Sequence, residues 1–143
     1  VVIPEVSGAS VEARSNTLKE ELRFMREEIE AFKYQHTDIS PGYPSGNASA
    51  TPDASDFATQ MTTATDTAFN AVDSSAANAL GPYLSAMPVN PVNGKSTVLV
   101  LDSSATFPTS ADDSYGWVYQ PSTLTFKSDA TGTDQSGVDY FDY

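Results

Sequence analysis

The chain has 143 residues, no cysteine and a formal net charge of −12, from 19 acidic and 7 basic side chains. This length favours one domain with a single modest core, and the lack of cysteine excludes a disulfide framework and thiolate metal sites. So acidic a surface makes nucleic acid an unfavourable partner and favours divalent cations.

The first six residues, VVIPEV, combine apolar β-branched residues with a proline. A proline inside a helix in water costs about 3 kcal/mol, whereas membrane-spanning helices tolerate it. A bilayer crossing needs about 20 apolar residues, far more than this stretch contains. We therefore expect it to be the end of a hydrophobic membrane segment whose remainder precedes Val1.

The next stretch, from Asn16 to Tyr34, has the pattern of an amphipathic helix. Its apolar residues recur at steps of four and three and so lie on one stripe; they are Leu18, Leu22, Met25, Ile29 and Phe32. Charged residues occupy the other faces, so the stripe must pack against the rest of the domain. A helix from Glu5 to His36 would be roughly 48 Å long, whereas a domain of this size has a radius of gyration of about 15 Å. The N-terminal part of the helix is therefore predicted to project toward a partner.

Turn formers end this helix near Thr37, because residues 40–47, SPGYPSGN, contain two prolines and two glycines. His36, the only histidine, lies just before the break. We expect it to be a polar residue at the helix C-terminus, where a cation is favoured, rather than a general base or a metal ligand.

The middle of the chain predicts little regular structure. Asp53 to Phe69 has the spacing of a short helix with Asp53 or Ser55 as its cap. The prolines of residues 81–94 then predict an irregular segment whose apolar side chains pin it to the core.

The last third of the chain carries the strand patterns. Thr97 to Leu101, TVLVL, is β-branched and continuously apolar, which predicts a central strand or one buried on both faces. Residues 115–119 and 124–127 predict a hairpin. The chain is thus expected to be α+β, with a long N-terminal helix packed on a small antiparallel sheet. We divide it into residues 1–36, the helix; 37–96, an irregular connecting region; and 97–143, the sheet and an acidic tail.

The tail, residues 128–143, spaces its acidic residues with glycine and serine. Calcium takes six to eight oxygen ligands, from carboxylates and backbone carbonyls, and such a loop can supply them. Asp129, Asp134 and Asp139 are therefore candidate Ca²⁺ ligands. The alternative is an acidic, solvated end whose aromatic residues, Tyr140, Phe141 and Tyr143, pack on the sheet.

Four features, in this order, resemble the major pseudopilins of type II secretion and the related type IV pilins. They are the VVIPEV start, the amphipathic helix followed by a GYP loop, the proline segment GPYLSAMPVNPVNG and the hairpin GWVYQPSTLTF. The resemblance covers most of the chain and is weakest over residues 45–79. It implies a pilin-like fold, a structural subunit of a pseudopilus or pilus-like filament, and a C-terminal calcium loop.

The resemblance also assigns assembly to the N-terminal helix, which would lie in the bacterial inner membrane first and against copies of itself afterwards. The filament would be periplasmic or on the cell surface. The residues expected at the filament interface are Val1, Val2, Ile3, Val6, Val11 and Arg14. The alternative is a soluble extracytoplasmic module that binds calcium or a glycan. The sequence has no HExxH, P-loop, GxGxxG or nucleophile-turn motif, so we do not expect an enzyme.

Overall fold

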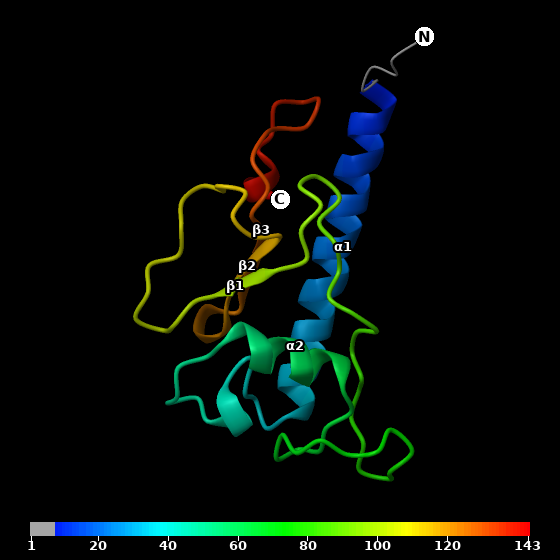
Figure 1. Cartoon of the computed structure of the whole chain (residues 1–143), viewed down its shortest axis with the longest axis vertical. Coiled ribbons are helices and arrows are strands. Elements are labelled where there is room, and N and C mark those ends of the chain that lie inside the picture. The colour runs from blue at the N-terminus through cyan, green and yellow to red at the C-terminus, as the bar shows by residue number, and fades with distance from the viewer. Residues whose placement is uncertain (1–7) are drawn as a thin grey trace.

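The computed structural model describes residues 8–143 and has an α+β arrangement. Figure 1 shows the long helix α1 along the long axis of the molecule, with the sheet beside it and α2 across the lower part. The elements are α1 (Gly8–Gln35), α2 (Ala54–Thr62), β1 (Val98–Val100), β2 (Trp117–Gln120) and β3 (Thr125–Ser128). A helix followed by a sheet confirms the α+β prediction.

The apolar stripe of α1 is buried as predicted. Its five residues, Leu18, Leu22, Met25, Ile29 and Phe32, are each 2% exposed or less, and α1 packs on β3. At 1.5 Å per residue, its 28 residues span roughly 42 Å. The helix ends at Gln35, and Thr37 and Asp38 take positive φ values directly after it, so the predicted break near Thr37 is confirmed.

The short helix α2 also begins where the sequence indicates. The Asp53 carboxylate accepts a hydrogen bond of 2.7 Å from the Asp56 backbone N–H, which satisfies one of the free N–H groups of the first turn. Phe57 and Met61 point into the core and are fully buried. α2 ends at Thr62, seven residues before the predicted end at Phe69. Residues 63–97 form turns and isolated bridges, and for residues 81–94 this is what the prolines predict.

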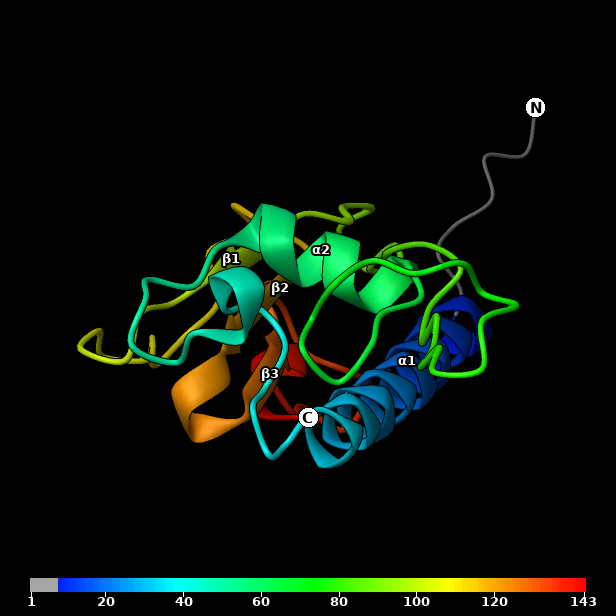
Figure 2. The same cartoon turned by 90° about the horizontal axis from the view of Figure 1, so that it is seen from below.

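That irregular segment lies against both helices, and Figure 2 shows it beside them from below. The Tyr83 backbone N–H donates to the Met61 carbonyl of α2, and the Tyr83 hydroxyl donates to the Gln35 side chain at the end of α1. The segment therefore joins the two helices and closes the core on the side away from the sheet hairpin.

The sheet corrects two predictions. Its strand order is β1-β2-β3; β2 and β3 pair antiparallel, confirming the predicted hairpin, but β1 and β2 pair parallel. The sheet is therefore mixed rather than antiparallel. β1 is an edge strand with only Val98 buried, whereas β2 is central and buried along its length. A run of three apolar residues carries no information on its neighbours, and here the loop of residues 101–116 returns the chain to the end where β1 began.

The core lies between α1, α2 and the sheet, and aromatic rings fill its centre. Phe57 of α2 lies 4.5 Å from the Tyr119 ring of β2, and Trp117 stacks on Phe126 at 5.4 Å, centroid to centroid. The Tyr119 hydroxyl donates to the Pro41 carbonyl and the Trp117 indole N–H donates to the Pro88 carbonyl. Because their polar atoms are paired, these large side chains are buried without loss of hydrogen bonds.

Candidate assembly surface

Two of the six predicted filament-interface residues, Val11 and Arg14, lie in the first turns of α1. Val1, Val2, Ile3 and Val6 lie outside the described residues, and Val11 and Arg14 are both partly exposed. Beside these turns lies the C-terminal loop, where residues 134–136 face Glu12, Ser15 and Lys19 across a shallow pocket. Ser15 is the one side chain of residues 10–17 that is buried, and so the start of the described helix has little contact with the core. Within residues 8–143, no helix has the length and apolar character that crossing a bilayer requires.

Asp129, at the end of β3, is only 3% exposed and ties two loops together. Its carboxylate accepts hydrogen bonds from the backbone N–H groups of Asp112, at 3.2 Å, and Tyr115, at 2.9 Å. Burial raises the pKa of Asp129, although these two bonds oppose the rise. This carboxylate therefore holds the loop before β2 against the end of β3.

The other two predicted calcium ligands lie elsewhere in the tail. The Asp134 carboxylate accepts from the Tyr143 hydroxyl, at 2.6 Å, and from the backbone N–H of Val138, and these bonds lower the pKa of Asp134. Asp139 is exposed. In the part of the chain that the structure describes, no three His, Asp or Glu side chains are grouped as a metal ion requires. Calcium binding thus stays a prediction.

The aromatic residues of the tail pack on the domain, as the alternative interpretation of this segment expects. Tyr140 is 6% and Phe141 7% exposed. The Tyr143 ring meets Tyr140 edge-on with 5.6 Å between centroids.

His36 lies where the sequence predicts, but it is more deeply buried than expected. It does sit at the helix C-terminus, but it is fully buried and stacks on Phe32 with 3.7 Å between ring centroids. Nδ1 lies 2.8 Å from the Phe32 carbonyl and Nε2 lies 2.7 Å from Thr65 Oγ1. A carbonyl only accepts, so Nδ1 carries the proton and Nε2 accepts from the hydroxyl. Burial lowers the pKa of His36, so it is a neutral core residue rather than a cation.

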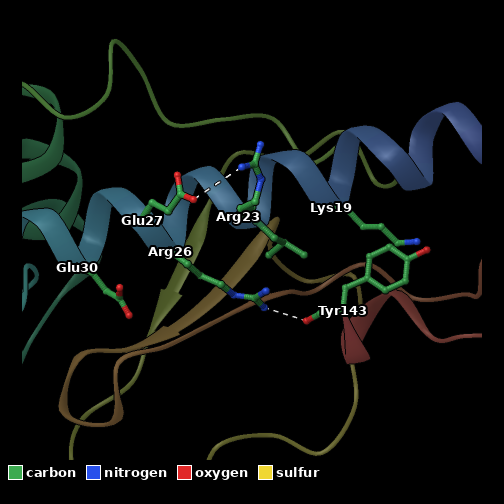
Figure 3. A pocket seen from close by; sticks show the side chains of 7 residues that line it. Lys19, Arg23, Arg26, Glu27, Glu30 and Tyr143 are labelled. Carbon is green, nitrogen blue, oxygen red and sulfur yellow. Dashed lines mark hydrogen bonds and ion pairs between the residues drawn. The ribbon is translucent and has the colours of Figure 1, made fainter.

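A groove between α1 and the C-terminal end gathers basic side chains (Figure 3). We call Lys19, Leu22, Arg26 and Tyr143 the basic groove; Arg23, Glu27 and Glu30 also line it. The Arg26 guanidinium donates to the carbonyls of Phe126, at 2.9 and 3.1 Å, and Tyr143, at 2.8 Å. Lys19 Nζ lies 4.8 Å from the centroid of the Tyr143 ring, so a cation and an aromatic ring share one surface.

Another face of α1 presents an aromatic side chain to solvent. Phe24 is 49% exposed, and its neighbours one helical turn away on either side are all glutamates. We call Phe24 with Glu20, Glu21 and Glu28 the Phe24 knob, because the fourth glutamate, Glu27, also lines the basic groove. Within residues 8–143, one Glu21 carboxylate oxygen is buried without a hydrogen-bond partner, and burial raises the pKa of Glu21 and Glu28.

Neither the basic groove nor the Phe24 knob was among the predicted interface residues. The knob has a signal in the sequence, because glutamates three and four residues before and after Phe24 must surround it on a helix. The groove has none, since Tyr143 reaches Arg26 only through the fold.

Comparison of the chain with protein-family models, curated proteins and solved structures finds no match. Any functional assignment therefore rests on the residues and geometry described above.

Proposed function

We propose that the chain is a structural subunit of a pseudopilus or pilus-like filament, built in the bacterial inner membrane and assembled through the N-terminal part of α1. The observation that carries this proposal is that α1 begins well before the first of its apolar residues that is buried in the core. The helix begins by Gly8, whereas its buried apolar stripe begins only at Leu18. About three turns of helix thus precede the part that holds the domain together.

The α+β layout supports the same proposal. A long first helix packed on a small sheet is the arrangement that a pilin-like subunit needs, because the helix can enter a filament core while the sheet domain stays outside. The domain beyond α1 is strongly acidic, with only Lys95 and Lys127 as basic residues after Tyr34, which suits a solvated outer layer.

Assembly would move apolar helix surface from lipid into contact with neighbouring helices. Lipid tails and leucine side chains are equally apolar, so close packing and polar pairing rather than hydrophobic transfer drive this step. Val1, Val2, Ile3, Val6 and Val11 would supply the packing, and Arg14 would pair with an acidic group of a neighbouring subunit.

The test is electron microscopy of the full-length protein from its native cells, compared with a variant that starts at Ser10. We expect filaments from the full-length protein. The truncated variant should give a folded monomer, checked by circular dichroism and size-exclusion chromatography, because the buried stripe of α1 is intact.

Filaments from the truncated variant would contradict assembly through the N-terminal helix. A full-length protein that stays a soluble monomer would favour the calcium- or glycan-binding module instead. As a control, Val72→Ala changes a residue of the irregular segment far along the chain from α1, and it should leave filament formation unchanged.

A further inference from the structure

We propose that the Phe24 knob of one subunit docks into the basic groove of a second copy of the chain. This inference rests on the proposed function, since it names the contact between the globular parts of neighbouring subunits. The knob and all of the groove except Tyr143 would then lie on α1, the helix that also carries the filament core.

The Phe24 knob combines an exposed phenyl ring with glutamate side chains. Such a surface is complementary to one that is both basic and apolar. Arg23 pairs with Glu20, at 2.6 Å, and with Glu27, at 3.8 Å. Glu21 and Glu28 have no ion pair among residues 8–143, and one Glu21 oxygen is buried there without a hydrogen bond. A cation brought to this face would approach the carboxylates around Phe24, and an apolar surface would cover the half-exposed phenyl ring.

The basic groove offers such a partner surface. Of the basic side chains after Tyr34, Lys95 donates to the Asp113 carbonyl and Lys127 donates to the Phe141 carbonyl. Lys33 lies 3.8 Å from Asp38. Lys19 instead lies over an aromatic ring with its charge exposed to solvent.

The two ends of the groove differ in charge. Arg26 and Lys19 are basic and the Tyr143 ring offers apolar surface, whereas Glu27 and Glu30 line the other end. The acidic knob is attracted to the Lys19 end and repelled from the Glu30 end. This difference sets the direction in which a neighbouring knob enters.

The positions on the helix explain why this contact would build a polymer. At about 100° per residue, Phe24 lies roughly 140° around α1 from Lys19 and 160° from Arg26. A subunit therefore uses one face to enter its neighbour and another to receive the next. A contact between two different patches leaves a free knob at one end of the assembly and a free groove at the other. Further subunits can then add at both ends, and an open filament can grow.

The test uses the absence of native cysteine. Two single-cysteine variants of the full-length protein, Glu28→Cys in the knob and Glu30→Cys in the groove, carry tags of different size and are assembled together. A short bis-maleimide is then added to the filaments. We expect the cross-linked heterodimer to exceed each variant's own homodimer at least fivefold. Ser74→Cys, on an exposed turn of the irregular segment, is the control partner and should give background cross-linking.

Two further variants test the contact by assembly. Phe24→Ala and Lys19→Glu should each lower the yield of sedimentable filaments about tenfold while leaving the circular dichroism spectrum unchanged, because both side chains are solvent-exposed. Tyr34→Ala is the matched control, since Tyr34 is an aromatic residue of the same helix, is 88% exposed and lies outside the knob. It should assemble normally.

The outcomes separate this inference from the function on which it rests. Filaments that give no knob-to-groove heterodimer, or cross-link only knob to knob, overturn the inference and leave the filament proposal standing. A full-length protein that forms no filaments overturns the filament proposal itself. A heterodimer above background, with assembly lost in Phe24→Ala and kept in Tyr34→Ala, supports the contact.

Discussion

His36 shows at the residue scale how burial changes the chemistry of a side chain. Its imidazole has a hydrogen-bond partner on each nitrogen and a phenyl ring against its face. Both bonds fit the neutral tautomer, and protonating Nε2 would set two donors against each other at the Thr65 hydroxyl unless that hydroxyl turned away. The residue therefore links the end of α1 to the segment after α2, and its burial favours the uncharged ring in this link.

This predicts a pH dependence of stability that belongs to His36. Burial lowers its pKa in the folded protein, whereas the unfolded value is about 6.5. Below the unfolded value the unfolded chain binds more protons than the native one, so the free energy of unfolding falls as the pH drops through about 6.5. Urea denaturation at pH 7.5 and 5.5 should show this fall, and His36→Gln should reduce it. An equal fall in the variant would assign the effect to other groups.

At the element scale, Gly116 allows the parallel pairing of β1 and β2. The Gly116 and Trp117 backbone N–H groups both donate to the Thr97 carbonyl, at 2.9 and 3.0 Å. A Cβ at Gly116 would lie 2.2 Å from the Lys95 carbonyl oxygen, and Gly116 does not have a positive φ. The glycine is thus required by the close approach of two backbones rather than by its own backbone conformation.

Gly116→Ala should therefore lower the free energy of unfolding by about 1–3 kcal/mol, the usual cost of forcing atoms into a packed site. Guanidinium denaturation measures it. The control is Gly94→Asn: Gly94 has a φ of +73° and open space around the added side chain, and asparagine tolerates that conformation. Gly94→Asn should lower the free energy of unfolding by much less than Gly116→Ala does. Similar losses in both variants would contradict the close-approach explanation.

At the scale of the whole molecule, the charges are unevenly distributed. Five of the seven basic residues lie on α1, and twelve acidic residues follow Tyr34. Subunits with acidic outer domains repel one another at long range, and this repulsion is what salt screens most strongly. The contact between knob and groove is short and becomes buried, so the same salt weakens it less.

Filament yield should therefore rise as NaCl increases from 10 to 150 mM, while the Debye length falls from about 30 to about 8 Å. Sedimentation of assembled protein measures this. If the tail binds calcium, CaCl₂ should raise the yield beyond MgCl₂ at the same ionic strength, and Asp139→Asn, at the exposed predicted ligand, should remove the difference. Equal yields with the two divalent ions would contradict a specific calcium site and leave only general screening.

Much of the fold is predictable from local patterns. The burial of Leu18 and Phe32, the Asp53 cap and the β2–β3 hairpin all follow from spacing over a few residues, because helix and turn contacts are local. The full burial of His36 was not predicted, and the position of β1 in the sheet was predicted wrongly. Each depends on neighbours that are far away in sequence: Thr65 for the histidine, and Trp117 for the strand.

The candidate site divides in the same way. The glutamates around Phe24 are determined by the sequence alone, since a helix must bring residues three and four positions apart onto one face. The exposure of Phe24 and the basic groove were decided only by the tertiary structure. Arg26 and Tyr143 are 117 residues apart, and they meet because β3 packs on α1 and the tail folds back over it. No local sequence pattern predicts this contact between Arg26 and Tyr143, because it depends on the path of the whole chain.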